Sequence, residues 1–486
     1  MRLLHAFASN AIGQVATIGI ALATVPLFTS AFGTERYGCY LLLLAFQPYF
    51  AIHQLAAARL VTVASAKQEL GDDSAPVMLR SILLCGIGLS ALFTALFFFA
   101  YPWFSARFSG DTAVVPEVGD AWVWAAALIL LNTVTLLQNH QLDGLKRFAA
   151  SNVLTNTGNL LALLLPLAPG LYDGSFDRLV MAIAIARLVQ AGIGWCLLPR
   201  TPWWRDTGKL MHEWAHHAGQ FGWLTLSALC NAAIVTIDRI LLGLTYSATA
   251  LYFYAVPVGV AGRFVVLAAA LGRAMGPDFA TARHERSVEL AREANHAVLA
   301  TMLLFALPLS FFAYDLLALW VGTAFADQST PIFRLAMVGL IGMSISQAPS
   351  ILLHSTGRAQ RQVWLQIVEV VPFVAAIYWA SGLGLIAVAW VVVLRNVIDG
   401  IAHLWLVGLG WRSALRSLLV ALSVLALGLA APRFDIMPVG QQMLMFALLA
   451  CIALAAIAIL FPRTLRFGLA QLRSYVVVPS GKAGQE

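Results

Sequence analysis

The sequence has 486 residues, of which 60% are hydrophobic and 11% are charged, against about 25% charged in an average soluble domain. A mean hydropathy of +0.82 excludes an ordinary soluble enzyme and indicates a chain that crosses a membrane many times. The formal net charge of +7 raises nucleic-acid binding as an alternative, which depends on where the cations lie.

Apolar runs long enough to cross the ~30 Å hydrocarbon core of a bilayer recur along the chain. The first run follows a segment with one arginine and no small-residue cleavage pattern, so we expect it to remain as a helix. Only four residues, 381–384, separate two runs between 363 and 407, which leaves the helix count there open. We predict an all-α membrane bundle of about fourteen transmembrane helices, at residues 9–31, 37–58, 78–101, 121–139, 149–168, 177–198, 219–243, 250–271, 296–320, 331–353, 363–381, 384–407, 414–431 and 441–462.

The basic residues indicate how these helices are oriented. An even number of spans places both termini on one side of the membrane. With the N-terminus inside, 21 of the 30 Lys and Arg residues fall in cytoplasmic segments, four in outer loops and five in helices or at their ends. This bias predicts a multi-pass protein of the bacterial cytoplasmic (inner) membrane with both termini in the cytoplasm. The cations form no Lys/Arg run, which argues against nucleic acid as a partner.

Several kinds of chemistry find no support in the sequence. No loop exceeds about 25 residues, and no G-x-x-x-x-G-K-[ST] phosphate loop occurs, so we expect no ATP hydrolysis on this chain. The five cysteines are scattered without C-x-x-C spacing. We therefore expect no enzyme: no catalytic residue, no cofactor and no metal ligand.

Three short motifs recur at a nearly constant offset. Tyr40 in YGCY aligns with Tyr254 in YFY, the DGLKRF motif at 143–148 aligns with STGRAQR at 355–361, and RLVQAGI from Arg187 aligns with RNVIDGI from Arg395. Each motif lies at the equivalent helix of a six-helix unit. Because six is an even number of spans, both units insert into the membrane in the same orientation, a layout known among transporters. We predict four regions: a first six-helix lobe at 1–198, a cytoplasmic linker at 199–218, a second six-helix lobe at 219–410, and two extra helices with a tail at 411–486.

Several motifs resemble one known family. They are Asn10 and Pro26 in the first helix, GTERYGCY after it, TIDRILLG at the end of the seventh, a Tyr-rich start of the eighth, and the GLKRF/TGRAQ pair. Over residues 9–410 the chain resembles the polysaccharide flippases (Wzx-like, PST branch) of the MOP exporter superfamily. One departure is Tyr252, which stands where this family has a glycine.

The resemblance implies two lobes around a V-shaped cavity and transport by alternating access. The substrate it implies is an undecaprenyl-pyrophosphate-linked oligosaccharide, a surface or exopolysaccharide repeat unit moved from the inner to the outer leaflet. The expected partners are this lipid-linked substrate and the membrane lipids, together with a polysaccharide polymerase and chain-length proteins. The sugar repeat, the driving ion (H⁺ or Na⁺) and the oligomeric state stay open.

A pyrophosphate carrier requires cations in a hydrated cavity, and arginine suits it because its planar guanidinium donates bidentate hydrogen bonds. Arg263 lies near the middle of the predicted span 250–271, so we expect it either to contact the headgroup or to pair with Asp238. Arg187 has no acid three or four residues away, so its partner must come from another helix, from water or from substrate. Arg395 has Asp399 one turn later, which favours an intrahelical pair.

The remaining candidates lie on other helices. His53, among Gln47 and Gln54 on an inward-running helix that ends near Arg59, is a candidate for the cavity wall, although a lone histidine is more often part of the bundle. Glu369 is a possible ion-coupling residue, with pairing to a cytoplasmic arginine as the simpler interpretation. Asp238 and Arg239 lie near the end of the seventh helix, where we predict an outer gate or a structural role, with Arg239 reaching the interface and Asp238 facing helix 8 or helix 2.

Two competing functions remain. A cation-coupled multidrug exporter of the related MATE branch would need acidic residues in its cavity, whereas the mid-helix charges here are mostly arginines. A membrane polymerase or ligase acting on lipid-linked glycans would need a large outer loop or outward-facing catalytic acids. The longest outer loop, at about 102–120, shows no such spacing. Flipping of a lipid-linked oligosaccharide is the function that the sequence favours.

Overall fold

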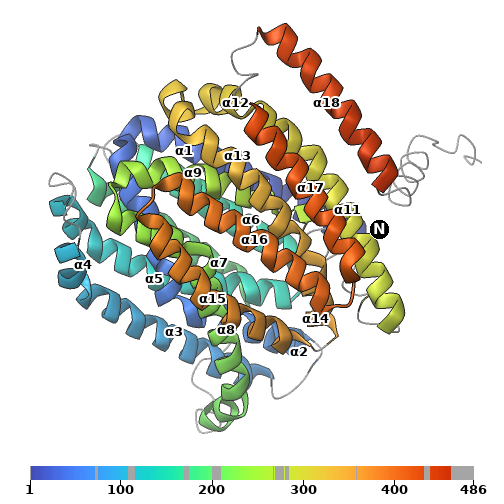
Figure 1. Cartoon of the computed structure of the whole chain (residues 1–486). Helices are drawn as coiled ribbons and strands as arrows, with labels where there is room; N and C mark the ends of the chain where they lie inside the picture. Colours follow the sequence, from blue (N-terminus) through green and yellow to red (C-terminus); the bar gives the residue numbers. More distant parts are fainter. Residues whose placement is uncertain are drawn as a thin grey trace, which may run out of the picture. The chain divides into compact units, whose positions relative to one another are not determined.

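The computed structural model describes residues 2–69, 71, 75–107, 115–168, 175–199, 210–265, 267–268, 279, 284–356, 358–431 and 438–460. Within these ranges all regular structure is helical and no strand occurs, which confirms the predicted all-α fold. The α-helices, labelled in Figure 1, are α1 (Arg2–Phe50), α2 (Ile52–Glu69), α3 (Ala75–Phe99), α4 (Tyr101–Arg107), α5 (Val115–Gly144), α6 (Phe148–Leu164), α7 (Phe176–Leu197), α8 (Leu210–Thr245), α9 (Ala248–Arg263), α11 (His284–Phe311), α12 (Ala313–Trp320), α13 (Thr323–Ile345), α14 (Gln347–Ser355), α15 (Ala359–Ser381), α16 (Leu385–Leu406), α17 (Gly410–Ala430) and α18 (Val439–Leu460). A short 3₁₀ helix, η1 (Leu165–Leu167), follows α6.

Each of the predicted spans overlaps a helix of the structure. Among the described residues, eleven segments are long and apolar enough to cross a membrane. One of them, Ile18–Phe50, joins two predicted spans, which are separated only by non-helical backbone at Gly33 (φ 82°). The chain is therefore a multi-pass membrane protein, and the exact number of fourteen helices stays a prediction.

The region from 363 to 407 contains two helices. α15 ends at Ser381 and α16 begins at Leu385, and Gly384 between them has a φ of 115°. Glycine adopts this backbone conformation at little cost because it has no β-carbon. The short Ser-Gly-Leu-Gly segment is thus a true reversal point rather than an irregularity within one long helix.

The structure interrupts the predicted span 250–271, since α9 ends at Arg263 and a turn follows at Phe264. Residues 265, 267 and 268 are helical again, and residues 266 and 269–271 lie outside the described residues. Pro257 lies inside this helix, and Gly259 and Gly262 follow it within two turns. Proline and glycine both weaken a helix, the first by removing a backbone donor and the second through conformational entropy. Arg263 is therefore the last residue of a helix, with an exposed side chain, and does not lie at the helix middle.

The chain forms two compact units. The first comprises Met1–Val256 and Gln366–Leu385, and the second comprises Pro257–Leu365 and Ile386–Glu486. The chain passes from the first unit to the second at Pro257 inside α9, and again beside Gly384. The predicted lobes at 1–198 and 219–410 stay predictions. Residues 200–209 of the predicted linker lie outside the described residues, and α8 begins at Leu210, within that linker.

In the first unit, α5 packs against α2, α3 and α7. The core between α2 and α3 is rich in alanine, and a β-carbon added to Gly86 of α3 would lie 3.2 Å from the methyl group of Ala57. Because lipid tails are as apolar as leucine, membrane helices gain stability from close packing rather than from burial alone, and small residues permit that packing. The small residues of α2 and α3 therefore place α2 tightly against its neighbours.

In the second unit, α11, α13 and α17 pack together (Figure 1). Arg334 of α13 is 5% exposed, and its Nε donates to the carbonyl oxygen of Ser310 at 3.1 Å. Ser310 lies in the last turn of α11, whose carbonyl groups have no partner within the helix and carry the negative end of its dipole. Arg334 thus caps α11. Farther along the chain, Phe446 of α18 contacts Phe311 and Phe312.

A close backbone contact joins α1 to the start of α9 in the first unit. A β-carbon added to Gly38 would overlap the backbone carbonyl of Ala248. Beside it, the rings of Tyr37 and Tyr252 meet edge to face at 5.8 Å, and the Thr29 hydroxyl donates to the Tyr252 hydroxyl at 3.2 Å. Tyr252 is fully buried, so the residue that departs from the family pattern is accommodated by this aromatic contact.

We expect Gly38→Ala to destabilise the protein, because a backbone carbonyl cannot rotate away as a side chain can. Overpacking of this kind costs about 1–3 kcal/mol. Gly19→Ala is the matched control on the same helix, since a β-carbon there meets nothing within 4 Å. Thermal unfolding of the purified protein in detergent measures the difference. Equal melting temperatures for the two variants would contradict the contact.

Candidate functional site

A cavity of about 430 Å³ lies within the first unit, among α1, α2, α5, α6, α7 and α8. Its wall combines small apolar residues with neutral amides and hydroxyls, and a single guanidinium. Among the described residues that line this first-unit cavity, no side chain is acidic. The polar ones are Gln47, Gln54, Asn132, Thr135, Asn139, Thr155, Arg187, Gln190 and Asn231.

The break between α1 and α2 brings two of these amides to the wall. Pro48 lies inside α1, and the helix is interrupted at Ala51, whose N–H donates to the Pro48 carbonyl at 3.2 Å. Proline removes a helical hydrogen bond and favours such a bend. Gln47 precedes the bend and Gln54 follows it, and both line the cavity. The Gln54 amide donates to the Thr133 hydroxyl of α5, which fixes its orientation.

α5 and α6 supply a second polar group. Asn132, Thr135 and Asn139 recur at i, i+3 and i+7 along α5, so they lie on one face of that helix. The Asn139 side-chain amide donates to the Thr135 carbonyl at 3.0 Å, and its oxygen accepts from the Thr155 hydroxyl of α6 at 3.1 Å. These residues are not among the candidates predicted from the sequence, although their helical spacing within an apolar span is a usable signal.

Arg187, the charged residue of the wall, is the twelfth residue of the 22-residue helix α7. One terminal nitrogen donates to the side-chain oxygen of Gln190 at 2.7 Å, and the other donates to that of Asn159 on α6 at 3.2 Å. The Gln190 amide in turn donates to the Leu154 carbonyl at 3.1 Å. The described hydrogen-bond partners of Arg187 are thus neutral amides, which orient the guanidinium without neutralising its charge.

Gly158 of α6 makes room for this arrangement. A β-carbon at this position would overlap the side-chain amide of Gln190. That amide is held at both ends, by Arg187 and by the Leu154 carbonyl, so it cannot move aside without losing a bond. The glycine therefore sets the position of the guanidinium in the first-unit cavity.

The other predicted residues of the first unit do not line this cavity. His53 is 1% exposed and stacks on Phe93 of α3 with ring centroids 5.2 Å apart, and Arg59 is exposed farther along α2. Glu369 is half-buried on α15. Their functional roles stay predictions.

Asp238 and Arg239 lie near the end of α8. Asp238 is 3% exposed, and one of its oxygens accepts a hydrogen bond of 2.7 Å from the Tyr254 hydroxyl of α9. The prediction that Asp238 faces the eighth predicted helix is therefore confirmed. Arg239 is half-buried beside it. The proposed gate role of the two residues stays a prediction.

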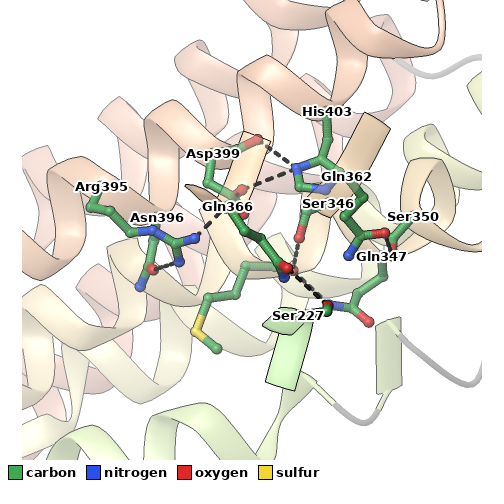
Figure 2. A network of polar contacts seen from close by, with 11 residues as sticks. Ser227, Ser346, Gln347, Ser350, Gln362, Gln366, Arg395, Asn396, Asp399 and His403 are labelled. Carbon is green, nitrogen blue, oxygen red and sulfur yellow. Dashed lines mark hydrogen bonds and ion pairs between the residues drawn. The ribbon is translucent and has the colours of Figure 1, made fainter. Parts of the chain in front are cut away.

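In the second unit, three ionisable side chains follow one another along α16: Arg395, Asp399 and His403 (Figure 2). The Arg395 guanidinium lies 3.6 Å from an Asp399 carboxylate oxygen, which confirms the predicted intrahelical pair. Nδ1 of His403 lies 3.1 Å from the same oxygen, and 2.9 Å from the Asp399 backbone carbonyl. Arg395 is the eleventh residue of a 22-residue helix, nearly the same place that Arg187 has in α7. The equivalent positions fit the predicted repeat, although Gly357 of that repeat lies outside the described residues.

Comparison with known proteins gives a family and a fold. Residues 70–330, more than half of the chain, match the family described as polysaccharide biosynthesis protein. A putative O-antigen transporter of Shigella flexneri is 24% identical over 190 residues, which cover 38% of this chain and 45% of that protein. The match thus spans less than half the length of this relative.

Solved structures share the fold. The lipid II flippase MurJ in an inward closed conformation has a TM-score of 0.72 at 12% identity, covering 94% of this chain and 99% of that one. An inward-facing multidrug resistance MATE family transporter of the MOP superfamily has a TM-score of 0.59 at 16% identity, covering 83% and 95%. At these identities the likeness establishes the architecture, and the predicted fold, an all-α multi-pass membrane bundle, is confirmed.

We expect Gly158→Ala to displace the Gln190 amide, release one side of Arg187 and lower transport activity at least several-fold at normal membrane levels. Gly192→Ala on α7 is the control, because a β-carbon there meets nothing within 4 Å. Complementation of a deletion strain, normalised to the amount of inserted protein, measures the effect. Full activity of Gly158→Ala would show that transport does not require the Gln190 amide to hold Arg187.

Proposed function

Because the chain belongs to the polysaccharide biosynthesis protein family, we propose that it translocates an undecaprenyl-pyrophosphate-linked oligosaccharide by alternating access. The substrate moves from the inner to the outer leaflet of the bacterial cytoplasmic membrane, and both termini lie in the cytoplasm. The observation that carries this proposal is the first-unit cavity, with its polar wall and its mid-helix arginine inside a multi-pass membrane protein.

The chemistry of the wall supports a glycan substrate. A sugar presents many hydroxyl groups, each of which donates and accepts hydrogen bonds. Asparagine and glutamine amides offer both functions on one side chain, as threonine hydroxyls do. Such groups inside a membrane are costly unless they are bonded or face water, and they therefore mark a transport pathway.

A cation-coupled multidrug exporter is the competing transporter. A cavity for cationic drugs requires a carboxylate, and the wall of the first-unit cavity, as far as it is described, carries a guanidinium and no acid. The names of the matched proteins include both a multidrug transporter and a lipid II flippase, so the fold does not discriminate between the two functions. The sign of the charge favours the anionic, lipid-linked substrate. A polymerase or ligase finds no support in the names of these relatives, which are transporters and flippases.

We expect that deleting the gene abolishes a surface polysaccharide and accumulates lipid-linked repeat units, because polymerisation outside the membrane depends on flipped substrate. The experiment measures surface polymer, together with accessibility of the accumulated lipid to a membrane-impermeant glycan-binding probe in spheroplasts. The accumulated lipid should be inaccessible until the membrane is opened. Normal polymer in a strain without a compensating flippase would contradict the proposal.

Arg263 remains our proposed contact for the pyrophosphate, now as an exposed residue at the end of α9 rather than at mid-helix. Arg263→Ala should lose complementation, while Arg263→Lys should retain part of it, because lysine preserves the charge without the bidentate geometry. Membrane levels of both variants serve as the control. Wild-type complementation by a correctly inserted Arg263→Ala variant would remove this residue from the headgroup site. The same proposal includes substrate contacts by Arg395 and His53. It also includes a functional interaction with a polymerase or chain-length protein.

A further inference from the structure

The first-unit cavity contains a positive charge that no described acid balances. Arg187 is held by the side-chain oxygens of Gln190 and Asn159. Both of these side chains are neutral amides. A guanidinium without a counter-ion is costly inside a membrane span, and in a cavity wall the missing anion is most simply part of the ligand.

The guanidinium retains the donors needed to bind that anion. Arginine has five N–H donors in a fixed plane, and the two amide contacts use one on each terminal nitrogen. Three donors therefore remain, enough for the paired hydrogen bonds that a carboxylate accepts. The two amides hold the plane of the guanidinium, so a ligand binds to a pre-oriented group.

The number of charges distinguishes two possible anions. The pyrophosphate that joins a carrier lipid to a sugar has two ionised phosphates, whereas an acidic sugar has one carboxylate. The described wall of the cavity contains one cation, so a pyrophosphate would leave one of its two charges without a partner there. A single carboxylate is balanced by the single guanidinium.

The remainder of the wall fits the body of a sugar. Neutral amides such as Gln54, Asn132 and Asn231 line the same cavity as the guanidinium, together with small apolar residues. These groups match ring hydroxyls and the C–H faces of a sugar. A volume of about 430 Å³ lies toward the lower end of the range for small-molecule sites, about 300–1,000 Å³. It therefore suits one or two sugar residues rather than a whole lipid-linked repeat unit.

We propose that the first-unit cavity is a glycan subsite for an acidic sugar, in which Arg187 binds the carboxylate of a uronic-acid-type residue and the surrounding amides bind its hydroxyls. This inference rests on the proposed function, and it specifies the transported repeat unit as one that carries an acidic sugar.

The test measures ligand-dependent thermal stabilisation of the purified full-length protein in detergent at fixed ionic strength. The probes are a disaccharide with one glucuronic acid, the same disaccharide with glucose in its place, and inorganic pyrophosphate. Wild-type protein should bind the acidic disaccharide about tenfold or more tightly than the neutral one, because a hydrogen bond to a charged partner is lost with the carboxylate.

Three variants test whether the preference for the acidic disaccharide depends on Arg187. Arg187→Gln should bind both disaccharides equally, and Arg187→Lys should keep part of the preference. Arg178→Gln, which removes an exposed arginine from the same helix, should keep all of it. If Arg187→Gln does not fold, the preference of the wild type and its partial retention in Arg187→Lys still decide the question.

Three results would overturn the proposal: equal binding of the two disaccharides by the wild type, absence of binding by either, or Arg187-dependent binding of pyrophosphate that is tighter than that of the acidic disaccharide. The last result would assign the arginine to the carrier headgroup and leave the proposed flippase function intact. Failure of that function appears separately, as a deletion strain with normal surface polymer.

Discussion

A permanently charged side chain halfway along a membrane helix is the constraint on which the first unit depends. Arg187 cannot face hydrocarbon without a cost of several kcal/mol, so neighbouring helices must supply polar groups and space. α6 supplies both, through the Asn159 amide and through Gly158, whose missing side chain admits Gln190. The same requirement gathers amides on α1, α2, α5 and α8 into one wall. The cavity and the helix packing around it therefore both accommodate the charge of Arg187.

The second unit meets the same constraint in a different way. Arg395 occupies nearly the same place in α16 that Arg187 has in α7, but its charge is balanced by Asp399 on its own helix. Arg334 is also buried, where it caps the carbonyl end of α11. These two arginines have structural partners in the described residues, whereas the partners of Arg187 carry no charge. The arginines at the equivalent positions of the predicted repeat thus differ in the partners that hold them.

The sequence predicts most of the fold and part of the candidate site. Apolar runs locate the helices because the bilayer fixes their length, and the four-residue spacing of Arg395 and Asp399 is enough to predict their pair. Arg187 could be selected because no acid lies within a turn of it. The interruption of the span containing Arg263 was not predicted, although Pro257 and two glycines, which weaken a helix, precede it in the sequence. His53 and Gln54 are neighbours in α2 and point about 100° apart around the helix, and only Gln54 lines the cavity. Which of the two faces the cavity depends on how α2 packs against other helices. The face formed by Asn132, Thr135 and Asn139 was visible as a spacing, but its cavity depends on α6, α7 and α8 packing around it.

The predominance of amides in this wall has an evolutionary consequence. Rotation of a side-chain amide by 180° exchanges its donor and acceptor without changing its shape or charge. Gln54, Asn139 and Gln190 are held by hydrogen bonds within the protein, so this freedom belongs to the other amides of the described wall, Gln47, Asn132 and Asn231. On the proposed function, these amides can satisfy sugar hydroxyls of either configuration, and exchanging one hexose for its epimer demands little of the protein. The fixed guanidinium has no such freedom. Lineages that diversify their surface antigens can therefore vary the stereochemistry of the sugar more easily than its charge.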